Sequence, residues 1–463
     1  MSPPSSRAGH LKPNSVAFLG ALAMSCAYMG PAVSVYYNTV PAARLGGSAF
    51  PLAFLASMVA CLLIAASIIE FSKKLQAASF AFTYASEGLG PRAGFISGWV
   101  ALLAYGMISP ITYAGFGLVA STFLHRQFGI EISWVYFFLG IGALVSALSY
   151  FGVNHSTRAT LIFLVLEITV MLALFSSVSY GTTNTWKAFE PPAGSGRIAF
   201  VSAGMVFGIL SFTGFEAAAN LGEETENARR TIPFAIAIAI VLIGLFYVFG
   251  AYVADIAFGL NAHALADNPA PFDTIARRTW GDGWAWLIDI TVLNSVFANA
   301  VAGKAAIVRN LYALGRARIL PQFLGRANRY GVPHNAILFD YGLSIALGLG
   351  FGAWQGAWAV WNLGGTIMSI GLILVYALVA TAAPFFFYRR HREEFSPLRH
   401  LVLPMLGAAC LLAPLAGSIY PAPNFPFNLA PYVVIAWIAL GAVYLAVTRG
   451  AGAWISPSES VEP

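Results

Sequence analysis

Long apolar runs follow one another along most of the chain, with short polar loops between them. Each run holds about 20 residues or more, enough for a helix that crosses a hydrocarbon core about 30 Å thick. We predict twelve such spans, at residues 15–44, 48–71, 91–123, 133–151, 158–180, 199–220, 231–258, 283–315, 335–353, 356–388, 399–419 and 429–448. The pattern therefore predicts an all-α membrane protein with polar tails at residues 1–14 and 449–463.

The composition agrees with this class. Hydrophobic residues make up 58% of the chain and charged residues only 10%, whereas about a quarter of the residues are charged in a typical soluble domain. The net charge of +6 would suit a nucleic-acid partner, but the basic residues fall between the spans and do not cluster on one face. We therefore expect contact with the lipid bilayer and no nucleic-acid partner.

The distribution of basic residues predicts the orientation in the membrane. Of the 25 Lys and Arg residues, eighteen fall on the side of the termini, six fall on the opposite side, and Lys304 lies within a span. Cytoplasmic loops carry the excess of Lys and Arg in membrane proteins. We therefore predict a multi-pass protein of the cell membrane with both termini in the cytoplasm.

Two of the predicted spans are interrupted. The first contains YMGPAVS at Tyr28–Ser34, where Gly30 and Pro31 remove a side chain and then a backbone donor. The sixth contains SFTGFE at Ser211–Glu216. Because lipid cannot pair with backbone polar groups, an interrupted helix in a membrane lines a cavity or is buried in protein. A packing kink is the alternative, since Gly is frequent in membrane helices.

The two interruptions lie five spans apart, at corresponding positions of two five-helix halves. This arrangement is typical of transporters built from inverted repeats, in which the substrate binds between the halves. We predict a first repeat at residues 15–180, a second repeat at 199–388 and two additional C-terminal helices at 399–448.

Three stretches, in order along the chain, resemble the amino acid, polyamine and organocation permease family. They are EFSKKLQAASFAFTYASEGLGPRAGFISGW at Glu70–Trp99, FTGFEAAANLGEETENARRTIP at Phe212–Pro233 and RNLYALGRARILP at Arg309–Pro321. The resemblance extends over all twelve spans. It implies the LeuT-like fold, a five-plus-five inverted repeat with two extra helices.

The resemblance also implies a substrate site at the two breaks, formed by Gly30, Pro31, Ala32, Val33, Ser211, Phe212, Thr213 and Gly214. N–H groups at the start of a half-helix suit the carboxylate of an amino acid, and carbonyls at the end of a half-helix suit its ammonium. The pocket wall would then come from Tyr105, Tyr113, Asn294, Trp358 and Trp361. Packing or interface anchoring is the alternative role for these side chains.

Two positions depart from the family pattern. Many members carry Gly-x-Gly at the first break, where this chain has Pro31 and Ala32. Many also carry a lysine in the fifth span, where this chain has Glu167. Both positions lie where the family handles its substrate and coupling ion, so the resemblance does not name the substrate.

Three charged residues within the spans are candidates for function. Glu216 follows the second break and is expected to act as a gate or a structural hydrogen-bond acceptor, with pairing to a substrate amine as the alternative. Glu167 lies about 13 Å into the bilayer, and an intramembrane carboxylate predicts a functional site with a partner. Lys304 is the predicted partner, and protonation of Glu167 would release the first helix. A static ion pair or a neutral Glu167 is the alternative.

The sequence favours transport over catalysis. No nucleophile with an adjacent base, phosphate loop or group of metal ligands stands out, so we expect no enzyme, metal or other cofactor. The predicted function is a secondary active transporter that imports an amino acid or related amine by alternating access. A proton is the expected coupling ion, and sodium is the alternative. An exchanger or polyamine carrier, and a nutrient sensor that does not transport, are the other hypotheses.

Overall fold

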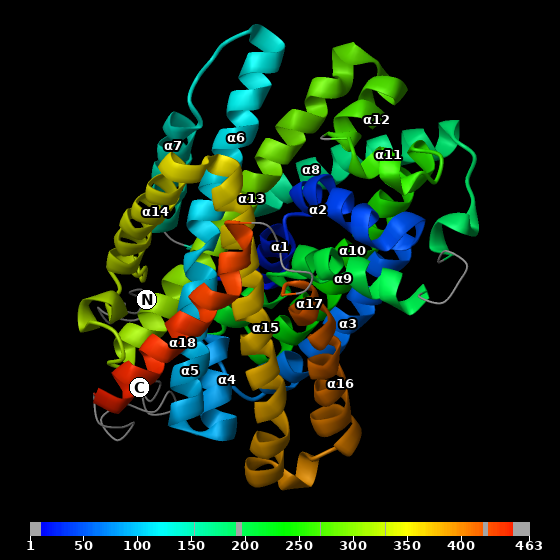
Figure 1. Ribbon diagram of the computed structural model, residues 1–463. Coiled ribbons are helices and arrows are strands. Elements are labelled where there is room, and N and C mark those ends of the chain that lie inside the picture. Colours follow the sequence, from blue (N-terminus) through cyan, green and yellow to red (C-terminus); the bar gives the residue numbers. More distant parts are fainter. Residues whose placement is uncertain are drawn as a thin grey trace, which may run out of the picture.

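The computed structural model describes residues 11–151, 153–190, 197–268, 270–328, 330–419 and 425–447 of the 463-residue chain (Figure 1). Its α-helices are α1 (Phe18–Tyr28), α2 (Pro31–Gly46), α3 (Phe50–Ser72), α4 (Phe80–Leu89), α5 (Pro91–Gly106), α6 (Ile108–Phe128), α7 (Trp134–Tyr150), α8 (Val153–Gly181), α9 (Arg197–Phe212), α10 (Ala228–Ala257), α11 (Ala262–Ala266), α12 (Pro271–Trp280), α13 (Asp282–Arg316), α14 (His334–Gln355), α15 (Ala357–Arg390), α16 (Leu403–Cys410), α17 (Leu412–Gly417) and α18 (Ala430–Val447). Within these ranges the chain forms no β-strand, and its one isolated β-bridge joins Val16 to Thr225.

The helices identify a multi-pass membrane protein. Ten helical segments among the described residues are long and apolar enough to cross a membrane. One of them, Phe18–Ser72, is 55 residues long and contains α1, α2 and α3, and α7 is a shorter apolar helix. The all-helical membrane class is therefore confirmed. The count of twelve spans and the inverted repeat stay predictions.

The third predicted span is two helices, α5 and α6, that meet at Met107. Pro110 lies in the first turn of α6. In an unbroken helix its ring would clash with the carbonyl of Gly106, and it has no N–H to donate to that carbonyl. The apolar run continues through this point, so the hydrophobic pattern alone did not predict the bend.

The first predicted break is confirmed between α1 and α2. Gly30 has φ 57° and ψ 69°, a left-handed conformation that Gly adopts without a steric penalty. Pro31 then takes the first position of α2, where a missing N–H costs little. A Cβ atom on Gly30 would lie 2.7 Å from Nδ2 of Asn299 on α13, so the break is closely packed against that helix.

The second predicted break is confirmed between α9 and the 3-10 helix η3 (Phe215–Leu221). Gly214 precedes η3 with φ 110°. A Cβ atom there would lie 2.6 Å from the Tyr28 ring and 2.9 Å from the Tyr28 carbonyl carbon. Because Tyr28 is the last residue of α1, the two breaks touch each other.

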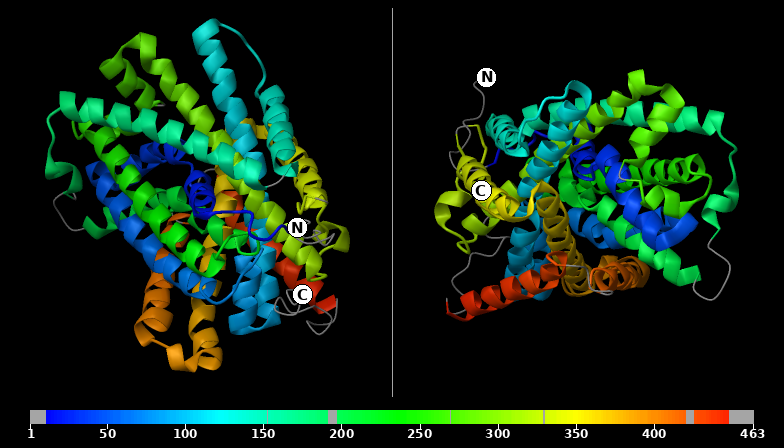
Figure 2. Two further views of the ribbon diagram at one scale, coloured as in Figure 1. Left: turned by 180° about the vertical axis from the view of Figure 1, so that it is seen from behind. Right: turned by 45° about the horizontal axis from the view of Figure 1, so that its top comes forward.

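The interrupted helices lie in the interior of the helix bundle, as Figures 1 and 2 show for α1 and α2. α2 packs against α9, and α1 packs against α8, α10 and η3. The two longest helices, α13 and α15, both pack against α6. The candidate site lies where these helices meet.

Candidate functional site

A small cavity of about 70 Å³ lies at the two breaks. Its walls come from α1, α2, α6, α9, α13 and α15, together with Met29 and Thr213 in the breaks. The side chains with polar groups on its wall include Tyr28, Ser34, Asn38, Thr112, Thr213 and Asn299. Among the described residues that line it, none carries a charged side chain. The cavity therefore presents dipoles to a ligand.

A larger vestibule of about 810 Å³ adjoins the small cavity. The two share Asn38 of α2, Leu210 of α9, and Trp361 and Gly365 of α15 as wall residues. A ligand that moves from the vestibule into the small cavity therefore passes these four residues.

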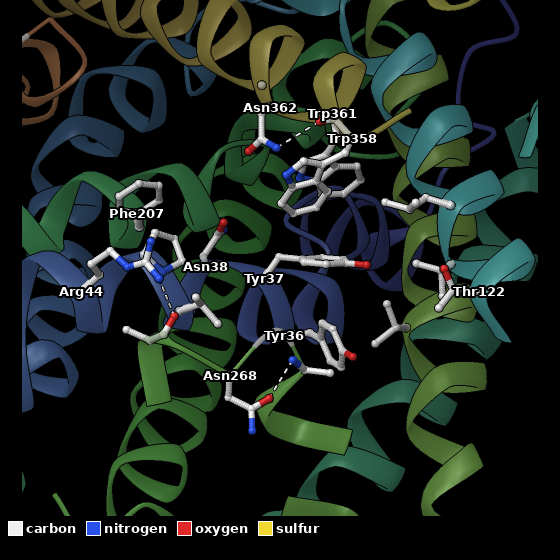
Figure 3. Close-up of a pocket in the computed structure, with 18 of the residues that line it drawn as sticks. Tyr36, Tyr37, Asn38, Arg44, Thr122, Phe207, Asn268, Trp358, Trp361 and Asn362 are labelled. Carbon is white, nitrogen blue, oxygen red and sulfur yellow. Dashed lines mark hydrogen bonds between the residues drawn. The ribbon is translucent and has the colours of Figure 1, made fainter. Parts of the chain in front are cut away.

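Aromatic side chains gather beside this shared wall. Figure 3 shows Tyr37 between Tyr36 and the two tryptophans of α15. The centroid of the Tyr37 ring lies 5.0 Å from that of Tyr36, 5.6 Å from Trp358 and 5.5 Å from Trp361. Such a cluster covers the approach to the small cavity with rings that can pack on an apolar group or attract a cation.

Charged residues line the vestibule in pairs of opposite sign. The Arg126 guanidinium of α6 lies 3.5 Å from the Asp273 carboxylate and 3.8 Å from the Asp289 carboxylate. Arg44 at the end of α2 lies 3.5 Å from Asp267 and donates a hydrogen bond to a backbone carbonyl, visible in Figure 3. These pairs tie α2 and α6 to the segments that precede and begin α13.

The backbone donors at the start of α2 are already paired. The Ala32 N–H donates to Oε2 of Glu167 on α8 at 3.2 Å. The Val33 N–H donates to the Ser295 hydroxyl of α13 at 3.1 Å. Pro31 has no N–H. The groups predicted to receive a substrate carboxylate therefore bind acceptors of the protein itself.

Glu216 accepts three hydrogen bonds at the second break. Its carboxylate accepts hydrogen bonds from the Tyr105 hydroxyl at 2.9 Å, the Tyr376 hydroxyl at 2.7 Å and the Gly214 N–H at 3.1 Å. The side chain is fully buried and does not line the small cavity. This geometry fits the predicted structural acceptor, and it places Glu216 away from a ligand in the cavity.

The carbonyls of the two breaks are also linked. The Tyr247 hydroxyl of α10 lies 2.7 Å from the Met29 carbonyl and 2.9 Å from the Ser211 carbonyl. Phe212 packs on the Tyr247 ring with centroids 5.2 Å apart. Within Ser211–Gly214, the segment predicted to bind the amine, Thr213 lines the small cavity.

The predicted wall residues fall into two groups. Trp361 lines both cavities, and Trp358 lines the vestibule. Tyr105, Tyr113 and Asn294 line neither of the two. Tyr105 binds Glu216 instead. The ring of Tyr113 packs on a phenylalanine of α7, and the Asn294 amide donates to a backbone carbonyl of α8.

The predicted ion pair between Glu167 and Lys304 is wrong. The Lys304 ammonium lies 2.8 Å from the Asp340 carboxylate of α14 and donates to the Ser146 hydroxyl of α7 at 3.0 Å. Glu167 lies against α2. The prediction compared depths in the membrane, but depth does not say which face of a helix a side chain occupies.

The residues at the site that the sequence reasoning missed include Tyr37, Asn38 and Asn299. A signal was present for two of them. Asn38 lies one helical turn after Ser34, so both polar side chains share one face of α2. Asn299 is an amide in the middle of an apolar span, a position at which a polar side chain predicts a buried hydrogen bond or a binding site.

Ion pairs join the other end of α13 to the loop that follows η3. Arg309 lies 2.5 Å from Glu224, and Arg316 lies 2.8 Å from Glu223. The vestibule lies near the start of α13, where Asp289 is one of its wall residues. The molecule therefore has a vestibule near one end of this helix and a loop that is ion-paired to the other end.

A further ion pair lies on the same side, outside the apolar segments. The Lys74 ammonium after α3 donates to both carboxylate oxygens of Glu394, at 2.6 and 2.7 Å. This hydrogen bonding lowers the pKa of Glu394, because it favours the charged carboxylate. Because the pair is exposed, it contributes little stability.

Comparison with known proteins identifies the family to which the chain is similar. The amino acid permease family model matches residues 24–450. The low-affinity putrescine importer of Escherichia coli strain K12 is 23% identical over 440 residues, which is 91% of each chain. The branched-chain amino acid permease of Bacillus subtilis strain 168 is 25% identical over 352 residues, 71% of this chain and 74% of the relative. The methylthioribose transporter of the same strain is 24% identical over 324 residues, 67% of this chain and 68% of the relative.

Proposed function

The chain belongs to the amino acid permease family, and from this premise we propose that it is a secondary active transporter that imports an amino acid or a related amine. It is a permease and not an enzyme. The names of its relatives include a putrescine importer and a branched-chain amino acid permease. These names support a small amine or amino acid as the substrate class.

One observation carries this proposal: two interrupted helices meet at a small polar cavity, and a vestibule adjoins it. Interrupted helices in transporters bring backbone groups to the substrate near the middle of the membrane. Here Tyr28, Met29 and Val33 from the first break and Thr213 from the second line the same cavity. A packing kink would not require the two breaks to share a cavity.

Alternating access is the proposed mechanism. The arrangement that supports it has a vestibule near the start of α13 and a loop after η3 that is ion-paired to the end of α13. If both termini lie in the cytoplasm, the vestibule faces the outside and this loop closes the inner face. The proposed moving units are the two five-helix repeats at residues 15–180 and 199–388, followed by the helices at 399–448.

A proton is the proposed coupling ion, with sodium as the alternative, and Glu167 is the proposed carrier. Its Oε2 atom accepts a hydrogen bond from the Ala32 N–H at 3.2 Å, so the carboxylate touches the first break directly. Protonation removes the negative charge and weakens this hydrogen bond. Glu167 would thus act on α2 itself, without Lys304.

Uptake into proteoliposomes tests the proposal. Purified protein is reconstituted, and the uptake of labelled amino acids and amines is compared with and without an inward proton gradient. Concentrative uptake supports the proposed transporter. Uptake only into vesicles preloaded with a second amine would identify an exchanger, and binding without any uptake would identify a sensor.

A pair of glycine variants sharpens this experiment. Gly365 on α15 lies on the shared wall of the two cavities, and no heavy atom lies within 4 Å of a Cβ built there. Gly140 on α7 has the same open space but lines neither cavity. Gly365→Leu is expected to block uptake, and Gly140→Leu is expected to retain it. Normal uptake by both variants would contradict the proposed route.

A further inference from the structure

The first break has no free backbone donor for a ligand. The Gly30 N–H donates to the Ala27 carbonyl at 2.9 Å, and the Ser34 N–H donates to the Gly30 carbonyl at 2.8 Å. Between them, Pro31 has no N–H. The remaining two donors bind Glu167 and Ser295, as described above. A ligand carboxylate at the start of α2 would therefore have to displace one of these acceptors.

The acceptor on Ala32 is itself a carboxylate. Glu167 is buried, and Oε2 lies at the N-terminal end of α2, where the helix dipole favours a negative charge. Two carboxylates at one such site repel each other, and in a buried environment the repulsion is strong. The side chain of Glu167 thus occupies the position that an amino acid would need for its carboxylate.

Three polar side chains of the small cavity already donate hydrogen bonds within the protein. Ser34 donates to the Met29 carbonyl at 2.7 Å, and Thr112 donates to a carbonyl of its own helix at 2.8 Å. The Asn38 amide donates to the Ser211 hydroxyl at 2.8 Å. The Thr213 hydroxyl and the indole N–H of Trp361 also line the cavity, so it presents donors as well as acceptors.

Two buried oxygens on the cavity wall have no hydrogen-bond partner among the described residues: the Tyr28 hydroxyl and Oδ1 of Asn299. The Asn299 amide is oriented by its Nδ2 atom, which donates to the Tyr28 carbonyl at 2.8 Å. Its oxygen is therefore left as a free acceptor. Tyr28 is only 1% exposed, so solvent does not satisfy its hydroxyl group.

An ammonium group has three donors and no acceptor. Two of its donors would bind Asn299 Oδ1, which can only accept, and the Tyr28 hydroxyl, which can accept as well as donate. The cavity of about 70 Å³ has room for such a head group, and the rest of the ligand would extend past Trp361 into the vestibule. The aromatic cluster there suits a cationic or apolar chain.

We infer that the preferred substrate is a primary amine without an α-carboxylate, because Glu167 fills the carboxylate position of the first break and Asn299, on the cavity wall, has a free acceptor oxygen. This inference rests on the proposed transport function. It selects one of the two substrate classes that the family name and the relatives leave open.

Matched ligand pairs that differ only by the α-carboxylate test the inference on the unmodified full-length protein. The pairs are putrescine and ornithine, cadaverine and lysine, and isoamylamine and leucine. Binding is measured by thermal shift in detergent, and uptake is measured in proteoliposomes. Each amine is expected to bind at least about tenfold more tightly than its amino acid, since juxtaposed like charges cost several kcal/mol.

The outcomes separate this inference from the proposed function. If the amino acid of each pair binds as tightly as the amine or more tightly and is taken up, the inference is wrong and the proposed function stands. If no member of any pair binds or is taken up, the proposed function fails and the inference fails with it.

Two variants test the role of Glu167. Glu167→Ala frees the Ala32 N–H, so the ratio of amine to amino acid affinity is expected to fall by about tenfold or more. Asp255→Asn is the control, because this buried carboxylate of α10 lines neither cavity. A ratio that stays unchanged in both variants would overturn the assignment of Glu167.

Discussion

The Lys304 ammonium lies 2.8 Å from the Asp340 carboxylate, and neither side chain is exposed. The Ser109 hydroxyl donates to the same carboxylate at 2.8 Å, and Lys304 donates to Ser146 at 3.0 Å. This network joins α13 and α14 to α6 and α7, and none of its four residues lines the small cavity. A buried pair of this kind is costly to break, because removing one partner leaves the other charge uncompensated.

Breaking this pair is therefore expected to destabilise the protein. Asp340→Asn should lower the free energy of unfolding by about 3 to 5 kcal/mol, the cost of leaving the buried ammonium unpaired. A decrease in Tm in detergent, followed by a tryptophan fluorescence melt, measures the effect.

A double variant separates charge compensation from packing. Lys304→Met combined with Asp340→Leu removes both charges and keeps most of the volume, so it should recover much of the lost Tm. If the double variant is as unstable as Asp340→Asn, charge compensation does not explain the role of the pair.

The second break gives a prediction about binding. A side chain on Gly214 would collide with Tyr28, and its φ of 110° disfavours any residue except Gly. Gly214→Leu is expected to abolish substrate binding while the helices persist, as judged by circular dichroism and a binding assay in detergent. Gly140→Leu is again the matched control. Normal affinity in Gly214→Leu would contradict a site at the break.

The positions of the two breaks were predictable from the sequence for a local physical reason. Gly30 followed by Pro31 removes a side chain and a donor in succession, and this combination ends a helix in almost any surroundings. Gly214 lies just before a segment that is rich in charged residues, and this change in composition marks the end of the apolar run. The bend at Met107 was missed because Pro110 lies within an uninterrupted apolar run.

Side-chain partners were less predictable, because they depend on how the helices rotate about their axes. Glu167 and Lys304 were matched by depth, yet α13 presents Lys304 to α7 and α14. Asp340 lies within a predicted span, so a search for every intramembrane carboxylate would have offered it as a second candidate partner. Tyr105 was likewise assigned to the pocket wall, whereas its hydroxyl binds Glu216.

The charged loops allow a test of the orientation in the membrane. Arg316 binds Glu223, so the loop after η3 and the end of α13 lie on one side. Thr225 is buried and Asn328 accepts two backbone hydrogen bonds, so exposed neighbours are better labelling sites. Glu226→Cys and Gln322→Cys are expected to react with a membrane-impermeant maleimide only in inside-out vesicles.

An exposed position near the vestibule is the control for this labelling. Glu131 follows α6 on the side of Arg126, so Glu131→Cys should react in intact cells. If Glu226→Cys is labelled in intact cells and Glu131→Cys is not, the orientation predicted from the basic residues is reversed.

Proton coupling at Glu167 is the final prediction. A negative charge on Glu167 strengthens its hydrogen bond to the Ala32 N–H and so holds the start of α2. In the unmodified protein, lowering the external pH at fixed internal pH is expected to raise uptake. Glu167 is charged while the substrate binds and then takes a proton from outside, which releases α2, so the proton enters with the substrate. Glu167→Gln has no titratable group at this position, so its uptake should no longer respond to the proton gradient, while exchange of substrate across the membrane continues.

The measurement is the initial uptake rate into proteoliposomes at several external pH values. Glu216→Gln is the comparison, since its carboxylate lies at the second break. A proton response that survives in Glu167→Gln and disappears in Glu216→Gln would move the coupling site from the first break to the second.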